Sequence, residues 1–387
     1  MQTPTLTFID TAALRHNLAR VRATAPGARV MSVIKANGYG HGLATVARAL
    51  AGSDGLAVAR LEEGLALRSA GLENPILLLE GADGFAVARL EEALALRATS
   101  TRKRILMLEG ALTAEQLAVA AREGIELMLH TFDQLAMLES YSGAELVRAW
   151  VKLDTGMNRL GFRVENFAEA LDRLGRIRCV VPGPVLATHL ASADELANPQ
   201  TGSQLASFEA ATHGLAGERS IANSAGILAW PMAHGDWVRP GLMLYGISPF
   251  PEGSGRDVEL RAAMTFQTGV IAVKTVRQGE AVGYGGDWRA QRPTTMAVVA
   301  AGYGDGYPRG ARSGTPVIVN GRRASLIGRV SMDMLTVDVT DLPPVEVGDP
   351  VELWGNALPV EEVARWAGTI PYVLTCAVSQ RVPRVVR

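Results

Sequence analysis

Residues 30–42 read Val-Met-Ser-Val-Ile-Lys-Ala-Asn-Gly-Tyr-Gly-His-Gly. The run from Val30 to Ile34 is short, apolar and rich in β-branched side chains, which is typical of a buried strand. It ends in Lys35, and three glycines follow between positions 38 and 42. A desolvated lysine has a lowered pKa, and its neutral amine can condense with a carbonyl group. The stretch therefore predicts either a Schiff-base lysine or a strand-end lysine that extends to water.

Strand and helix patterns alternate along the first two thirds of the chain. A helix is predicted from Thr11 to Arg22, with Asp10 as its N-cap. The predicted strands are 5–9, 30–34, 146–153 and 185–189. Such alternation favours an α/β fold, the (β/α)8 TIM-like barrel. Lys35, Lys152 and His189 then lie near carboxyl ends of strands, where barrel enzymes place their active sites.

The C-terminal third has a different secondary-structure pattern. From about residue 265, short β-rich runs alternate with turns rich in Gly, Asp and Pro. This pattern predicts a mostly antiparallel β domain, with Pro249–Gly255 as a linker before it. We therefore expect a barrel domain over residues 1–258 and a β-rich domain over residues 259–387.

One unit of the chain is duplicated. Residues 55–68 recur at 84–97 with 12 of 14 identical, and the repeated units span 55–81 and 84–110 at an offset of 29 residues. A ninth strand would upset the strand number and shear that close an eight-stranded barrel. We therefore expect residues 82–104 to form extra, helical material outside the barrel wall, without a role in the chemistry.

The composition excludes several classes of function. Lys and Arg number 38 against 39 Asp and Glu, so no basic surface for nucleic acid or membranes is indicated. No apolar run reaches the ~20 residues of a membrane-spanning helix, and no secretory signal pattern is present. Cys179 and Cys376 form neither a metal pattern nor a disulfide framework. We expect a cytoplasmic protein without a bound metal.

Further motifs follow the Lys35 segment in a fixed order. They are Lys152-Leu-Asp-Thr-Gly-Met-Asn-Arg-Leu-Gly161, Ala187-Thr-His-Leu-Ala-Ser-Ala-Asp194, Asn223-Ser224, Val238-Arg-Pro-Gly241, Val282-Gly-Tyr-Gly285, Gly302-Tyr-Gly-Asp-Gly-Tyr-Pro-Arg309 and Ser331-Met-Asp-Met334. In this order the chain resembles the alanine racemases, which are pyridoxal-phosphate enzymes built from a barrel and a β domain. The resemblance runs from about residue 4 to the C-terminus.

The resemblance implies roles for individual residues. Lys35 would hold pyridoxal 5'-phosphate and carry a proton on one face of the substrate, and Tyr284 of a second subunit would act on the other face. Arg239 would face the pyridine nitrogen and, because arginine keeps its proton, leave that nitrogen unprotonated. The implied cofactor contacts are Lys35, Tyr39, His189, Asn223, Ser224, Arg239, Gly241, Leu242 and Tyr372.

The substrate contacts are implied in the same way. Arg159 would position the carboxylate of the substrate, and Lys152 matches a lysine that is usually carbamylated in the family. From the β domain, Tyr303, Met332 and Asp333 would close over the active site of the partner subunit. Tyr303 would narrow the entrance and so favour a methyl side chain, with Arg309 in the same corridor. These roles imply a homodimer with shared active sites.

The predicted function is therefore the interconversion of L-alanine and D-alanine by a two-base mechanism. Three alternatives stay open at this point: a racemase with broader specificity for small amino acids, a decarboxylase on the same barrel, and a pyridoxal-phosphate-binding protein without catalysis. A decarboxylase needs a carboxylate at the pyridine nitrogen, so Arg239 speaks against it. The β domain with Tyr284 and Tyr303 speaks against a mere carrier.

Overall fold

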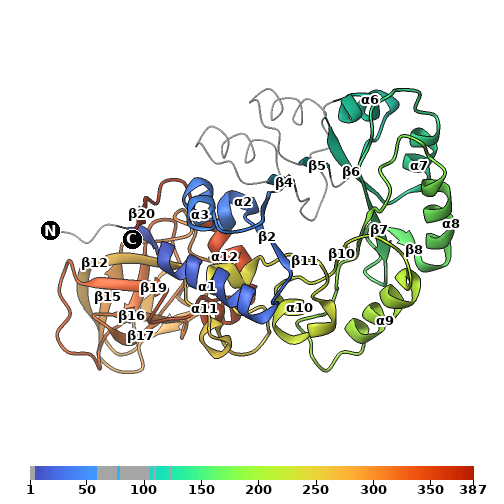
Figure 1. The fold of residues 1–387 in the computed structure, drawn as a ribbon. Coiled ribbons are helices and arrows are strands. Elements are labelled where there is room, and N and C mark those ends of the chain that lie inside the picture. Colours follow the sequence, from blue (N-terminus) through green and yellow to red (C-terminus); the bar gives the residue numbers. More distant parts are fainter. Residues whose placement is uncertain (1–4, 59–75, 79–104, 108–109, 123) are drawn as a thin grey trace.

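A ring of parallel strands is joined to a mostly antiparallel sheet in the computed structural model, which describes residues 5–58, 76–78, 105–107, 110–122 and 124–387 (Figure 1). The ring consists, in order, of β2 (Arg29–Val33), β3 (Gly55–Val58), β4 (Ile76–Leu78), β5 (Ile105–Met107), β6 (Ile125–Leu129), β7 (Ala149–Asp154), β9 (Val185–Ala187), β10 (Arg219–Ser220) and β11 (Trp237–Val238). It closes where β11 pairs with β2. The predicted fold class, an α/β barrel followed by a β domain, is confirmed.

Three strands of the ring are buried on both faces. Every residue of β3, β6 and β9 is buried, which explains why β3 and β9 read as continuous apolar runs rather than alternating ones. A short further strand, β8 (Phe162–Arg163), pairs with β7 beside the ring. The ring thus provides a rigid wall whose carboxyl ends carry the polar loops.

The number of strands in the ring differs from the prediction. Nine described strands close it, because β4 from the first copy of the duplicated unit pairs with β5 from the second copy, at Leu78 and Met107. The two copies have nearly the same apolar sequence at these positions, so both have the same capacity to form a buried parallel strand. The expectation that the wall keeps eight strands was wrong, while residues 82–104, predicted as extra material, lie outside the described residues.

Helices cover the outer side of the ring, and Figure 1 shows α6 to α9 along it. The helices of this part are α1 (Thr11–Thr24), α2 (Lys35–Tyr39), α3 (Leu43–Ala49), α6 (Ala114–Arg122), α7 (Phe132–Glu139), α8 (Val164–Gly175), α9 (Gln200–Thr212) and α10 (Ser224–Ala229), with the 3-10 turns η1 (Pro231–Ala233), η2 (Leu242–Tyr245) and η3 (Gly255–Val258). Asp10 caps α1 as predicted, since its carboxylate accepts a hydrogen bond from the Ala13 amide at 2.9 Å. Among the described residues, no helix has the length and apolar character needed to cross a membrane.

The β domain is built on one eight-stranded sheet. Its order is β15 (Thr294–Val299), β18 (Leu335–Asp338), β17 (Arg322–Leu326), β16 (Pro316–Val319), β19 (Pro350–Trp354), β12 (Met264–Val276), β1 (Leu6–Ile9) and β20 (Arg384–Val386). Since β15 also pairs with β12, the first six strands close a second, smaller ring. The hairpin β13 (Ala281–Val282) and β14 (Trp288–Arg289), the turn η4 (Tyr284–Gly286) between them, α11 (Val360–Trp366) and α12 (Pro371–Ala377) complete the domain.

The N-terminal strand belongs to the β domain. The strand at residues 5–9 exists nearly as predicted, but β1 pairs with β12 in antiparallel fashion and with β20 in parallel, and it is not part of the nine-stranded ring. The chain therefore begins in one sheet, builds the barrel and returns to the first sheet. The division at residue 258 stays a prediction.

Candidate active site at the mouth of the barrel

The backbone changes its handedness directly after Lys35. Residues 36–39 have φ between 51° and 62°, a left-handed conformation that costs a non-glycine residue about 1–2 kcal/mol. Hydrogen bonds hold the turn, because the Gly38 amide donates to Ile34 O and the Leu43 amide to the Asn37 side chain, each at 2.9 Å. The turn keeps Lys35, which is partly buried, at the carboxyl end of β2, as predicted.

Gly40 lets the β domain approach this turn. A Cβ atom at position 40 would lie 1.9 Å from the carbonyl oxygen of Thr375 in α12. Only glycine fits at this contact, and its φ of 81° is also in the region that favours glycine. The segment after Lys35 is therefore locked between the barrel and α12.

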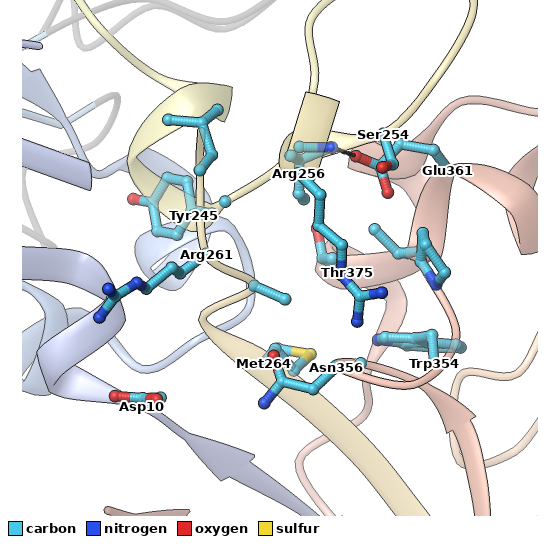
Figure 2. Close-up of a pocket in the computed structure, with 18 of the residues that line it drawn as sticks. Asp10, Tyr245, Ser254, Arg256, Arg261, Met264, Trp354, Asn356, Glu361 and Thr375 are labelled. Atoms are coloured by element: carbon cyan, nitrogen blue, oxygen red, sulfur yellow. Dashed lines mark hydrogen bonds between the residues drawn. The ribbon is translucent and has the colours of Figure 1, made fainter. Parts of the chain in front are cut away.

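The same turn buries Tyr39 in a stack of aromatic rings. The ring of Tyr39 lies 4.6 Å from that of Tyr245 and 5.7 Å from that of Tyr372, and Tyr245 also lines a neighbouring cavity (Figure 2). Burial raises the pKa of Tyr39, and burial together with the Asp194 carboxylate raises the pKa of Tyr372 to about 12. Both phenols are therefore protonated at neutral pH and can donate hydrogen bonds.

Hydroxyl groups and backbone amides adjoin Tyr39 from the end of the barrel. The hydroxyl of Ser224, at the start of α10, accepts hydrogen bonds from the amides of Gly241 at 2.9 Å and Met243 at 3.4 Å. A Cβ atom on Gly241 would lie 2.7 Å from the Tyr39 hydroxyl, so this hydroxyl lies directly against the backbone of Gly241. Asn223 caps α10 and thereby positions Ser224. Such a group of hydroxyls and amides at a helix start suits a phosphate.

Arg239 is held by neutral oxygen atoms. Its guanidinium donates to the hydroxyl of Ser220 at 2.5 Å and to the carbonyl oxygens of Thr188 at 2.8 Å and Ile221 at 3.1 Å. No ion pair of Arg239 is found in the described part of the chain. Burial lowers its pKa to about 10, so the group is still protonated at neutral pH. Arg239 can therefore only donate hydrogen bonds to a ligand.

His189 lies at the centre of the predicted residues. Its Nδ1 is 3.5 Å from the Arg239 guanidinium. Burial lowers the pKa of His189, and the nearby charges of Arg239, Arg159, Lys152 and Lys35 lower it further. The structure thus brings four predicted cationic residues together around one neutral imidazole.

The charge and the donors at this mouth fit pyridoxal phosphate. Lys35 offers an amine for its aldehyde, and the hydroxyls of Ser224 and Tyr39 offer hydrogen bonds for its phosphate. The excess of positive charge around His189 suits the anionic groups of the cofactor and the carboxylate of a substrate. Lys152 is partly buried in β7, and Arg159 is exposed in the loop after it, on the same side of the ring.

The predicted residues of the β domain lie outside this group. Tyr284, in η4, is 70% exposed, and Tyr303 and Met332 are also exposed. The loops of Tyr303 and Met332 run side by side, since the Gly304 amide donates to Met332 O at 2.8 Å. Within one chain, Tyr284 is not among the groups whose charges lower the pKa of His189.

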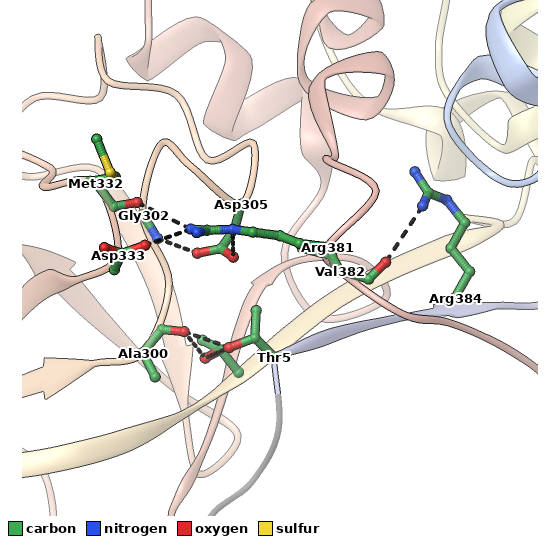
Figure 3. A network of polar contacts seen from close by, with 10 residues as sticks. Thr5, Ala300, Gly302, Asp305, Met332, Asp333, Arg381, Val382 and Arg384 are labelled. Carbon is green, nitrogen blue, oxygen red and sulfur yellow. Dashed lines mark hydrogen bonds and ion pairs between the residues drawn. The ribbon is translucent and has the colours of Figure 1, made fainter.

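An arginine that sequence reasoning missed ties these loops together. Arg381 pairs with Asp305 at 2.9 Å and with Asp333 at 2.8 Å, which links the Tyr303 loop to the Met332 loop (Figure 3). Ser220 and Tyr245 were missed as well, although they contact Arg239 and Tyr39. No local pattern marks such residues, because their role depends on partners that are distant along the chain.

Family models match both parts of the chain. The model described as "Alanine racemase, N-terminal domain" matches residues 9–83 and 78–249, and "Alanine racemase, C-terminal domain" matches residues 263–386. The two N-terminal matches overlap within the duplicated stretch. The divided match is consistent with one additional unit in this chain.

Individual relatives are similar over the whole length. An alanine racemase of Nitrosococcus oceani is 49% identical over 97% of this chain and 98% of its own, and one of Aeromonas hydrophila is 46% identical over 97% of each. Among solved structures, the biosynthetic alanine racemase of Pseudomonas aeruginosa aligns with a TM-score of 0.84 at 41% identity over 100% of both chains. An alanine racemase of Bartonella henselae with covalently bound pyridoxal phosphate aligns with a TM-score of 0.78 at 26% identity over 99% of both chains.

Proposed function

This chain belongs to the alanine racemase family, and on that premise we propose that Lys35 and Tyr284 are the two acid–base groups with which it interconverts L- and D-alanine. The chain is a pyridoxal-phosphate-dependent isomerase. When bound, pyridoxal phosphate supplies an electron-withdrawing system that lets the α-proton of the substrate leave. The observation that carries the assignment of the site is the convergence of Lys35, Lys152, Arg159 and Arg239 around His189.

Lys35 holds the cofactor and carries a proton on one face of the α-carbon. Its position at the end of β2, beside His189, places the amine at the mouth of the barrel where this role needs it. Tyr39, Ser224, Tyr372 and the backbone of Gly241 and Leu242 hold the phosphate, and Asn223 positions Ser224.

Arg239 would donate a hydrogen bond to the pyridine nitrogen and, because arginine keeps its proton, leave that atom unprotonated. Its protonated state and its anchors on Ser220, Thr188 and Ile221 support this role. His189 would lie against the cofactor ring, and its lowered pKa makes it a neutral group there. Through its contact with the pyridine nitrogen, Arg239 would limit the electron-withdrawing chemistry that the bound cofactor supplies.

Arg159 binds the carboxylate of the substrate. Lys152 is carbamylated, which converts a cation into an anion that can hold Arg159. Tyr303, Met332 and Asp333 close the entrance, and Tyr303 restricts the side chain of the substrate to about the size of a methyl group. The link from Arg381 to Asp333 supports a defined position for these loops.

The active unit is a homodimer in which each site takes Tyr284 from the other subunit. The exposure of Tyr284, Met332, Ile370 and Val373 supports this proposal, because large exposed apolar side chains are typical of an interface. We also place the domain boundary at residue 258, between the two family matches. A cytoplasmic location accords with the free thiols of Cys179 and Cys376.

The Tyr284→Phe variant tests this mechanism. Removal of one positioned acid–base group should lower the racemisation rate by about 10²–10⁴ while the cofactor absorption band is retained. Exchange of the α-proton with deuterated solvent should be lost for one enantiomer more than for the other. The matched control is Tyr141→Phe, which removes a phenol in the segment after α7. Full activity of Tyr284→Phe would contradict the proposal.

The role of Lys35 is tested separately. Borohydride reduction of the holoenzyme should attach the cofactor to the peptide that contains Lys35, as peptide mass analysis can show. Attachment to a different lysine would contradict the assignment.

A further inference from the structure

Two glutamines of α9, a helix on the outer side of the ring, form the same kind of contact (Figure 1). Gln204 is 1% exposed and Gln200 is half-buried. They are four positions apart, so their side chains leave the helix on the same face. Both side chains contact the loops that follow β7 and β9, and these loops carry Arg159 and His189.

Gln204 joins the two loops through both ends of its side-chain amide. The oxygen accepts from the Ala191 amide at 2.8 Å, and the nitrogen donates to the carbonyl oxygen of His189 at 3.0 Å and to the hydroxyl of Thr155 at 3.1 Å. The orientation of the amide follows from these partners, because a backbone N–H can only donate and a backbone carbonyl can only accept. Gln204 therefore fixes the backbone at His189 relative to the end of β7.

Gln200 makes a second bridge between the same loops. Its side-chain oxygen accepts from the Ser192 hydroxyl at 2.6 Å, and its nitrogen donates to the carbonyl oxygen of Gly156 at 3.1 Å. Gly156 begins a tight turn, in which the amides of residues 156, 157 and 158 all donate to one carboxylate oxygen of Asp154 at 3.0 Å. Arg159 follows this turn directly, so Gln200 fixes the start of the loop that carries it.

Two buried threonines extend the contact to Arg239. The hydroxyl of Thr155, which accepts from Gln204, lies 2.8 Å from the hydroxyl of Thr188. The backbone carbonyl of Thr188 in turn accepts from the Arg239 guanidinium at 2.8 Å. The ends of β7 and β9 and the guanidinium of Arg239 thus belong to one network of hydrogen bonds that is anchored on α9.

We propose that Gln200 and Gln204 are positioning residues, which hold the loop of Arg159 in a fixed place relative to His189. This inference rests on the proposed function, in which Arg159 binds the substrate carboxylate and His189 lies against the cofactor. A binding group on a loop costs conformational entropy when it is ordered, and a loop that is fixed beforehand avoids part of this cost. The glutamines act through the two loops, without touching the reacting atoms.

The Gln200→Met variant tests the bridge to the Arg159 loop. Methionine keeps the approximate length of the side chain and removes both hydrogen bonds. We expect KM for L-alanine to rise about tenfold with little change in kcat, since a displaced binding group weakens ground state and transition state alike. Calorimetric binding of propionate, which is alanine without its amino group, to the holoenzyme should weaken by the same factor. Unchanged KM and propionate affinity would overturn the proposal.

The Gln204→Met variant tests the bridge to His189. We expect the visible circular dichroism of the bound cofactor to change and kcat to fall about tenfold, because the imidazole against its ring is displaced. If this variant does not fold, Gln204→Glu is measured instead, which keeps an acceptor for the Ala191 amide and loses the donor to His189 O. A folded variant with the wild-type spectrum and kcat would refute the role of Gln204.

Thr212→Val is the matched control on the same helix. Thr212 is 0% exposed, and its hydroxyl donates to the carbonyl oxygen of Phe208 at 2.8 Å, within α9. The variant removes a buried hydrogen bond that leads to neither loop. KM, the propionate affinity and the cofactor spectrum should be unchanged. Changes as large as those of the glutamine variants would mean that the glutamines only stabilise α9, and would overturn the proposal.

A double-mutant cycle separates this inference from the proposed function. Arg159→Gln alone should raise KM and weaken propionate binding, and a normal Arg159→Gln variant would refute the role proposed for Arg159 itself. When Arg159 is already replaced, addition of Gln200→Met should have no further effect, because Gln200 acts through that residue. Independent, additive effects of the two substitutions would leave the role of Arg159 intact and overturn the one given to Gln200.

Discussion

Burial keeps the side chains of Tyr39 and His41, close to Lys35, in their neutral forms, because no group of opposite charge among the described residues stabilises their charged forms. Tyr39 and His41 are only two positions apart, and desolvation moves their pKa values in opposite directions, up for the phenol and down for the imidazole. Both changes favour the neutral form. The segment after Lys35 therefore carries two buried rings that are uncharged at neutral pH.

His41 should make the stability of the protein depend on pH. The unfolded chain takes up a proton at this residue below about pH 6.5, whereas the folded protein does so only near pH 4. Stability is therefore lost as the pH falls from 6.5 to 4, by about 3 kcal/mol from this group. Urea unfolding at several pH values should show this loss in the wild type and a shallower one in His41→Asn, which keeps a donor to Tyr39 O. Parallel pH curves for the two proteins would refute the prediction.

Among the elements, the left-handed turn of residues 36–39 stores backbone strain, because three of its four residues have a positive φ without being glycine. Ala36 has a φ of 54° without the freedom of glycine. Its cost is offset by the hydrogen bonds of the turn and by the contact with α12. Strain of this kind is retained where it positions functional groups, here Lys35 and Tyr39.

Relief of this strain is measurable. Ala36→Gly should leave the free energy of unfolding unchanged or raise it by up to about 1 kcal/mol, because glycine adopts positive φ without steric cost. Ala168→Gly, at an exposed position of the right-handed helix α8, should lower it by about 1 kcal/mol. Chemical denaturation of the two variants provides the comparison. A loss of stability in Ala36→Gly as large as in the control would show that the turn is not strained.

The duplicated unit can be removed without disturbing the flanking sequence. Residues 76–81 and 105–110 are nearly identical, so deletion of residues 82–110 joins the chain at an equivalent point. The ring would then have eight strands, with β4 next to β6, which is a geometry that closes. We expect the variant to fold, to bind the cofactor and to racemise alanine, as absorption and activity assays can show. An insoluble or cofactor-free variant would mean that the ninth strand is needed to close this ring.

At the scale of the whole molecule, active sites that are shared between two subunits have a testable consequence. Two inactive variants should regain activity when their subunits combine in one dimer. If Tyr284 acts across the dimer, a hybrid of Lys35→Ala and Tyr284→Phe subunits contains one site with both lesions and one intact site. Random mixing of the two proteins after dissociation should therefore restore about one quarter of the wild-type activity. Mixing without dissociation is the control. The absence of any gain in the hybrids would place Lys35 and Tyr284 in the same subunit.

Features that depend on residues close together in the sequence could be predicted, whereas features that depend on distant residues could not. The strand before Lys35, the cap at Asp10 and the change to a β domain after about residue 265 are confirmed, because each depends on side chains that are close in sequence. The roles of Tyr284, Arg159 and the other site residues stay predictions that rest on the family. The positioning residues Ser220, Tyr245 and Arg381 left no signal in the sequence.

By itself, the sequence determined the order of motifs, the lysine at the end of a buried strand and the two-domain architecture, since periodicity and chain order carry that information. Only the tertiary structure decided the number of strands in the ring, the place of β1 in the second sheet and the gathering of cations around His189. The physical reason is that hydrogen-bond and Coulomb partners are set by distance in space. In this chain those partners come from segments that lie far apart in sequence, as Ser220 and Thr188 do around Arg239.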